Sequence, residues 1–121
     1  MYDKNNVFAK IIRGELPSRK IYENEHALSI HNIYPKAEIH ALIIPKGDYK
    51  DIHDFLFNAP AAAQAGFWDA YRETANALGL SGNYNIAANT GDGPFFAQSI
   101  MHFHLHLLGG KSLVNKKELD L

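Results

Sequence analysis

Two segments of the chain place apolar residues at the spacing of an α-helix. The first covers residues 6–13, where Asn5-Asn6 would cap a short helix and Gly14 and Pro17 would end it. The second begins near Pro60, which suits a first helical turn, and ends near Gly79. The residues that would form the buried faces are Val7, Phe8, Ile11 and Ile12 in the first helix and Phe67, Tyr71, Thr74 and Leu78 in the second.

Five shorter stretches have the composition of β-strands, and turn-forming residues separate them. Pro45 would close the third stretch, and Gly109-Gly110 would close the last. Short turns between strands favour antiparallel pairing, and a helix set apart from them favours an α+β domain of two layers. The five stretches are residues 19–23, 26–32, 39–44, 84–88 and 100–108.

Composition narrows the class of protein. The chain has 121 residues, 46% hydrophobic and 21% charged, which suits one domain over residues 1–121. Its net charge of −1 provides no basic field for nucleic acid. The absence of cysteine excludes disulfides, thiolate nucleophiles and cysteine-based zinc sites. A polar start and the shortness of the apolar runs predict a cytoplasmic protein that does not bind membranes.

The last predicted strand carries His102, His104 and His106 in alternation with apolar residues. Because successive side chains of a strand point to opposite faces, the three imidazoles would form a row with a spacing of about 6.5 Å. The residues expected to point into the core are Phe103, Leu105 and Leu107. A solvated sheet face more naturally carries Thr, Lys or Glu, so the row indicates a functional site.

Two chemistries fit such a row. Histidines two residues apart on a strand can share a zinc ion, which His40 or Asp92 would help to bind. Alternatively, a neutral imidazole can attack phosphorus, and a charged one can bind phosphate. The loop over residues 89–97 favours phosphate, because Gly91 and Gly93 let backbone N–H groups turn toward an anion. We therefore expect phosphate chemistry that needs no metal and no other cofactor.

The histidine row resembles the signature of the histidine triad family, in which hydrophobic residues alternate with the histidines and two more follow the third. The similarity extends over roughly residues 7–110, and the family branch that the chain resembles is the histidine triad nucleotide-binding proteins, which hydrolyse purine nucleoside phosphoramidates. Residues 111–121 form a tail that does not match this branch. The segments that carry the resemblance are 8–17, 30–35, 40–46, 98–99, 102–108 and 109–110.

The resemblance implies a fold and an assembly. Family members have an α+β, HIT-like fold with a five-stranded antiparallel sheet, one long helix and one short helix. Two such sheets usually join into a ten-stranded sheet, through the long helix and a strand, so a homodimer is expected.

The resemblance also implies roles for individual residues. His104 would be the nucleophile that takes the nucleotidyl group, His102 and His106 would orient it and contact the phosphate, and His40 would support the three. The substrate would be a purine nucleotide derivative of AMP or GMP. The remaining implied contacts are Asn89, Gln98 and Ser99 with the α-phosphate or the leaving group, and Phe8, Ile11, Leu16, Ile30, His31 and Ile33 with the base and ribose.

The chain departs from the family pattern at a few positions. Asn32 stands where the family commonly has an aspartate that grips the ribose hydroxyls; an asparagine keeps one acceptor, adds a donor and loses the charge. The loop over 89–97 is longer and carries Pro94-Phe95-Phe96, and Ala97 stands where glycine is common. These departures leave open two alternatives, a dinucleoside polyphosphate hydrolase and a nucleotide-sensing or scaffold protein with little turnover.

Overall fold

The computed structural model describes residues 1–94 and 96–113. Phe95 and most of the tail over 111–121 lie outside the described residues. In the described part, the element order is α1 (Val7–Ile12), β1 (Lys20–Glu23), β2 (Ala27–His31), β3 (Ala37–Pro45), α2 (Ile52–Asn58), α3 (Ala61–Ala77), β4 (Asn85–Ala87) and β5 (Leu105–Leu113).

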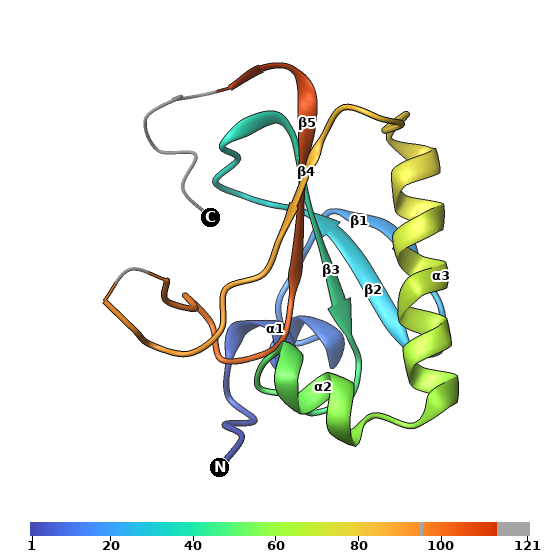
Figure 1. Ribbon diagram of the computed structural model, residues 1–121. Coiled ribbons are helices and arrows are strands. Elements are labelled where there is room, and N and C mark those ends of the chain that lie inside the picture. The colour runs from blue at the N-terminus through green and yellow to red at the C-terminus, as the bar shows by residue number, and fades with distance from the viewer. Residues whose placement is uncertain (95, 114–121) are drawn as a thin grey trace.

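The strands form one five-stranded sheet in the order β1-β2-β3-β5-β4, and all neighbours are antiparallel. Figure 1 shows α3 lying along one side of this sheet, with α1 and α2 near the end of β3. The predicted α+β class and its five-stranded antiparallel sheet are therefore confirmed. The pairing of two sheets in a homodimer is not tested by a single chain.

The helices begin at caps that the sequence only partly reveals. Asn6 caps α1 as predicted, because its side-chain oxygen accepts the N–H of Ala9 at 2.9 Å. Asp51 caps α2 by accepting the N–H of Asp54 at 2.8 Å, but this helix is too short for its period to show in the sequence. Pro60 is the residue before α3 rather than part of its first turn. None of the helices in the described residues has the length and apolar character needed to cross a membrane.

The last strand differs most from its prediction: β5 begins at Leu105 and ends at Leu113, where residues 100–108 were expected. The reason for the late start lies in the neighbouring strand. Continued past the Ile43–Leu105 pair, this register would place Ile44 opposite His104 and Pro45 opposite Phe103, but proline has no N–H to donate. The Phe103 N–H instead donates to the loop that follows β3. The histidine segment therefore enters the sheet from a stretch outside the ladder, which bends over residues 99–102.

Gly109 and Gly110 were predicted to end the last strand, but they lie within β5. The register against β3 shifts just after the Ile39–Gly109 pair, so the two glycines accommodate a bulge. Gly110 has a φ of +96°, which favours glycine, and a Cβ added at Gly109 would lie 2.5 Å from the Leu80 side chain. The glycines are thus required by a distortion inside the strand rather than by a turn.

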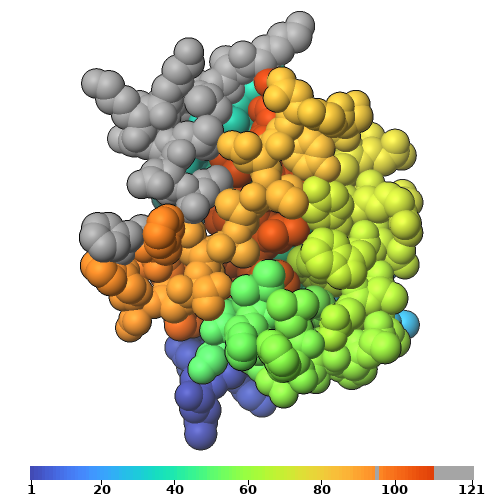
Figure 2. Space-filling model, in the orientation of Figure 1, coloured from blue at the N-terminus to red at the C-terminus, as the bar shows by residue number. Residues whose placement is uncertain are grey.

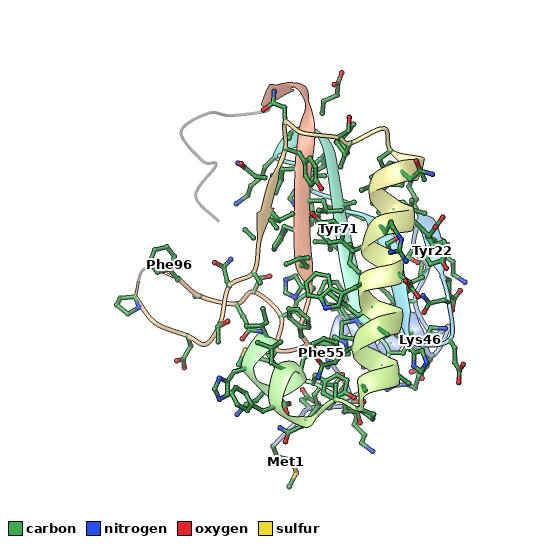
Figure 3. The ribbon with its side chains drawn as sticks, turned by 45° about the vertical axis from the view of Figure 1, so that its right-hand side comes forward. Met1, Tyr22, Lys46, Phe55, Tyr71 and Phe96 are labelled. Carbon is green, nitrogen blue, oxygen red and sulfur yellow. The ribbon has the colours of Figure 1, made fainter. Side chains whose placement is uncertain are left out.

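The two faces of the sheet carry separate hydrophobic clusters. On the α3 side, Phe103 packs against Phe55 of α2 and Phe67 of α3, with ring centroids 5.2 Å apart in both pairs. Figure 3 shows Phe55 and Tyr71 on this side of the sheet. Leu105 and Leu107 belong to the same cluster, which confirms the predicted core face of the histidine segment. The cluster on the other face comprises Phe8, Leu28, Ile30, Leu42 and Ile44.

Candidate active site

His102 is fully buried, and both of its ring nitrogens are bonded to other parts of the chain. Its Nε2–H donates to the carbonyl oxygen of Pro45 at 2.7 Å. The other nitrogen, Nδ1, therefore carries a lone pair and accepts the hydroxyl of Tyr2 at 2.5 Å. Both ring nitrogens are thus bonded within the chain, and the predicted contact between this imidazole and a phosphate would require one of these bonds to break.

His104 has the opposite arrangement. Its Nδ1–H donates to the backbone carbonyl of His102 at 2.7 Å, which leaves the lone pair on Nε2. Nε2 of His104 has no hydrogen-bond partner among the described residues. Because every fully buried side-chain nitrogen or oxygen of these residues has a partner, Nε2 is not fully buried. This nitrogen is therefore open to a ligand. The edge-to-face ring of Phe8, 4.8 Å away between centroids, fixes the plane of the imidazole.

His40 and His106 form a hydrogen-bonded pair beside His104. The backbone N–H of Lys36 donates to Nδ1 of His40 at 3.0 Å, so neutral His40 carries its proton on Nε2. That Nε2–H donates to Nδ1 of His106 at 2.9 Å. His106 must then carry its own proton on Nε2. One backbone amide thus fixes the tautomers of two histidines.

The tautomers of His104 and His106 place a lone pair of one ring beside an N–H of the other. The rings of His104 and His106 lie 5.1 Å apart between centroids. His104 offers an acceptor at Nε2, and His106 offers a donor at the same ring position. An electrophilic centre with bound oxygens fits such a pair, because one imidazole can attack while the other stabilises the negative charge that develops.

Burial keeps these imidazoles neutral. It lowers the pKa of His40 to about 4, with a smaller contribution from the Lys36 charge. Burial likewise lowers the pKa of His102 to about 4, against the effect of the Pro45 carbonyl. The pKa of His106 is lowered to about 3 by burial and then by His104, and the pKa of His104 is also lowered by burial. At neutral pH, His104 therefore has the unprotonated nitrogen that a nucleophile requires.

Asn32 lies against the histidine pair. Its side-chain oxygen accepts the N–H of Tyr34 at 3.0 Å, which turns the amide NH₂ toward His40. This NH₂ is 3.1 Å from Nε2 of His40, where the tautomer derived above also places a proton. Two donors thus face each other, and the Asn32 NH₂ is available to an acceptor on a ligand.

The side chain of Gln98 is engaged in bracing the 89–97 loop. Its oxygen accepts the N–H of Gly91 at 2.9 Å, and its NH₂ donates to the carbonyls of Lys50 at 2.8 Å and Ile100 at 3.2 Å. The predicted contact between this side chain and a phosphate would require one of these bonds to break.

Asn89 and Ser99 both precede the histidine row, on the segment that joins β4 to it. Asn89 is two residues beyond the Ala87–His106 pair, so the antiparallel register leads it toward His104. Ser99 is exposed and lines a cavity of about 520 Å³ next to the N-terminal segment. In the described part of the chain, neither side chain bonds to a histidine.

The residues predicted to line a base and ribose pocket are only partly brought together. Phe8 and Ile30 are buried in one cluster, and Ile11 packs against it. Leu16 and Ile33 are 39% and 75% exposed and lie outside that cluster. His31 is half-buried at the end of β2, and burial lowers its pKa.

The alternative to phosphate chemistry is a metal ion shared by several side chains. Within residues 1–94 and 96–113, no group of three or more His, Asp or Glu side chains is arranged to hold a metal ion. The nitrogens of His102 illustrate why, since the Pro45 carbonyl and the Tyr2 hydroxyl already bond them.

Sequence reasoning misses several groups that define the site. Tyr2 lies 100 residues from His102, and no spacing rule joins them. The Pro45 carbonyl and the Lys36 N–H are backbone groups, which a sequence does not distinguish from any other. The predicted side chains are therefore present, whereas the groups that set their protonation appear only in three dimensions.

Comparisons with known proteins agree with this architecture. The family model of the HIT domain matches residues 13–113. An uncharacterized 13.2 kDa HIT-like protein of Azospirillum brasilense is 44% identical over 113 residues, covering 93% of this chain and 91% of the relative. A HIT family hydrolase from Legionella pneumophila Philadelphia 1 has a TM-score of 0.77 at 35% identity, covering 88% of this chain and 94% of its own. A histidine triad nucleotide-binding protein from Candida albicans has a TM-score of 0.74 at 30% identity, covering 92% and 80%.

Proposed function

The chain belongs to the HIT domain family, and we propose that it is a hydrolase acting at the α-phosphate of purine nucleoside phosphoramidates. The observation that carries this proposal is the tautomer of His104. Its Nδ1–H is held by the His102 carbonyl, and its Nε2 is unprotonated and open. Two similar structures, a HIT family hydrolase and a histidine triad nucleotide-binding protein, support the class of reaction and ligand.

The reaction runs in two displacements. In the first, the Nε2 lone pair of His104 forms a bond to the α-phosphorus while the phosphorus–nitrogen bond to the leaving amine breaks. The amine departs with a proton from Ser99, His106 or water. In the second, water attacks the phosphorus, the bond to His104 breaks and its electron pair returns to Nε2. The proton of the attacking water passes to the group that protonated the amine. Dividing one difficult displacement into two is the benefit of covalent catalysis.

The neighbouring groups have distinct parts in this scheme. The His102 carbonyl holds the Nδ1 proton of His104 through both steps and stabilises the positive charge that the ring acquires when it bonds to phosphorus. The Nε2–H of His106 donates to a phosphate oxygen or to the leaving atom. The Asn32 NH₂ donates to an acceptor on the ribose. Phe8, Ile11 and Ile30 provide an apolar surface for the base.

The direct test combines turnover with trapping of the intermediate. Wild-type protein should hydrolyse adenosine 5′-phosphoramidate, and rapid quenching followed by mass spectrometry should find one adenylyl group on the peptide that contains His104. His104→Ala should lose turnover and adduct but still bind AMP in calorimetry. His53→Ala is the matched control, since His53 is exposed on α2 and should be dispensable.

Other outcomes would reject specific parts of the proposal. Faster turnover of a diadenosine polyphosphate than of the phosphoramidate would mean that the leaving group is a phosphate. Binding of AMP without turnover of either substrate would mean a nucleotide sensor. Wild-type turnover in His104→Ala would exclude the covalent mechanism.

We also propose that the working unit is a cytoplasmic homodimer of single HIT domains spanning residues 1–121. β4 forms one edge of the sheet, and its Ile86 is 54% exposed. Trp68 on α3 is 48% exposed. An edge strand and an adjacent apolar helix surface fit the joining of two sheets into a ten-stranded one. Light scattering should give twice the chain mass for the wild type and the chain mass for Ile86→Asp.

A further inference from the structure

The N-terminal segment Met1–Asn6 reaches the histidine row through one side chain. The Tyr2 hydroxyl is 2.5 Å from Nδ1 of His102, and the two rings meet edge to face at 5.6 Å between centroids. Figure 1 shows this segment leading into α1 beside the stretch that precedes β5. None of the roles assigned above uses this tyrosine.

We propose that Tyr2 is a positioning residue, whose hydroxyl fixes the His102 ring and, through the His102 carbonyl, the tautomer of His104. The kinetic part of this inference rests on the proposed function. The structural part, which is the bonding of two imidazoles, does not. Tyr2 touches neither substrate nor reacting atoms in this proposal.

The chemistry of His102 requires a donor at the position of the Tyr2 hydroxyl. The ring gives its only proton to Pro45, so its Nδ1 is an acceptor in a fully buried side chain. A buried acceptor without a partner is strongly unfavourable compared with a bonded one. Burial also raises the pKa of Tyr2, which keeps the phenol protonated and able to donate.

The geometry links this bond to His104. The same residue, His102, is bonded through its side chain to Tyr2 and Pro45, and through its carbonyl to Nδ1 of His104. Holding the ring at both nitrogens restricts the backbone on which the carbonyl sits. If the ring were released, the carbonyl could turn, and the proton of His104 would no longer be confined to Nδ1.

Hydrogen bonds within the N-terminal segment, and from α1 to it, hold Tyr2 in position beside His102. The side chain of Asn6 donates to the carbonyl of Asp3 at 2.7 Å. The guanidinium of Arg13 donates to the carbonyl of Lys4 at 2.7 Å. These bonds fold the segment back on α1, the helix whose Phe8 contacts His104.

Packing alone does not explain the position of this segment. A cavity of about 520 Å³ lies between the segment and residues 99–101, and Tyr2 is one of the residues that line it. Figure 2 shows the blue N-terminal residues next to the orange residues of this stretch at the molecular surface. Because the two segments are partly separated by open space, the hydroxyl–imidazole bond is a specific link between them.

The test compares Tyr2→Phe with Tyr22→Phe in the full chain. Tyr22 is also half-buried, but it packs on the α3 side of the sheet, and its hydroxyl makes no hydrogen bond within the described residues. Nitrogen-15 NMR of the imidazoles reports the protonation of each ring nitrogen. The Nδ1 resonance of His102 should move in Tyr2→Phe, and a second tautomer should appear at His104; Tyr22→Phe should leave both unchanged.

Kinetics provides the second measurement. With adenosine 5′-phosphoramidate, Tyr2→Phe should lower kcat about tenfold, the effect of losing one buried hydrogen bond, and leave KM within about twofold. Tyr22→Phe should match the wild type. A loss of kcat with an unchanged His104 tautomer would show a merely structural role and overturn the proposal.

Wild-type spectra test the inference without any variant. They should show His102 protonated at Nε2 and His104 protonated at Nδ1 near neutral pH. His102 protonated at Nδ1 would overturn the proposal, because Tyr2 would then have no acceptor. A wild type that does not hydrolyse the phosphoramidate would reject the proposed function, whereas the NMR comparison would still decide whether Tyr2 positions His102.

Discussion

The two faces of the segment from His102 to Leu107 are built from alternate residues of the same stretch, yet they depend on different interactions. On the core face, Phe103 is held by the volume and shape of Phe55 and Phe67. On the histidine face, each ring is held by hydrogen bonds that decide which nitrogen carries a proton. The core face should therefore respond to changes in size, and the histidine face to changes in hydrogen bonding.

The largest effect is expected when His104 loses its reactive nitrogen but keeps its hydrogen bond. In His104→Asn, the side-chain NH₂ can take the place of Nδ1–H and donate to the His102 carbonyl, whereas nothing replaces Nε2. Phosphoramidate turnover should fall by about 10⁴-fold or more, the scale found when a covalent nucleophile is removed. Steady-state kinetics measures this loss.

The free energy of unfolding of His104→Asn should change by less than about 1 kcal/mol, because the buried hydrogen bond is retained. His53→Asn, at an exposed site, should preserve both activity and stability. If His104→Asn unfolded at a much lower urea concentration, the histidine face would depend on ring packing, and the distinction between the two faces would fail.

The next largest effect is expected on the opposite face. Phe103→Ala should lower the free energy of unfolding by about 3–5 kcal/mol, since it leaves a cavity between two aromatic rings. Phe103 is 2% exposed, whereas Phe96 is 61% exposed and points away from the body of the molecule in Figure 3. Phe96→Ala is the control and should stay within about 0.5 kcal/mol of the wild type. Urea denaturation of both variants would show whether burial accounts for the difference.

Acidification should lower the free energy of unfolding through the buried histidines, because the side chains of the core face do not titrate. The unfolded chain binds a proton at each histidine near pH 6.5, but burial lowers the pKa of His40 and His102 to about 4 and that of His106 to about 3. Between these values the unfolded state binds more protons than the folded state. The free energy of unfolding should therefore fall as the pH decreases from about 6.5 to about 4, by up to about 1.4 kcal/mol per pH unit for each such group.

Urea denaturation at pH 7 and at pH 5 would measure this dependence. Phe96→Ala, at an exposed site without a titratable side chain, should leave the slope unchanged. Equal stability at the two pH values would mean that the buried histidines are not held neutral. The tautomers derived for His104 and His106 would then lose their basis.

These contrasts also show how far the sequence predicts the molecule. Alternation alone places Phe103 in the core, and Asn6 caps α1 as its position suggests, because both depend on neighbouring residues. The start of β5 is not predictable from its own residues, since it is set by the absence of an N–H in Pro45 of another strand. The tautomer of His40 depends in the same way on one backbone amide, that of Lys36. Local patterns were thus sufficient for most elements and for the two faces of the histidine segment, whereas α2, the bounds of β5 and the protonation of the histidines were not predictable from them.

The smallest effect, and the most specific test of the histidine face, is expected at Asn32. Its NH₂ faces the Nε2–H of His40 at 3.1 Å, so it does not stabilise a proton there. The carboxylate of Asn32→Asp would accept that N–H and favour the charged imidazolium. The pKa of His40 should therefore rise from about 4 by at least about one unit. Titration of the His40 ring protons by NMR measures this rise.

Asn32→Ala separates charge from the mere removal of the amide. It takes away the opposing donor without adding an acceptor, so the pKa of His40 should change far less than in Asn32→Asp. If both variants shifted that pKa equally, loss of the amide rather than a new acceptor would be the cause. The proton would then not lie on Nε2 of His40, and the donor assigned to His106 would have to be moved. A rise in Asn32→Asp alone would instead establish that His40 carries its proton on Nε2, as the Lys36 N–H requires.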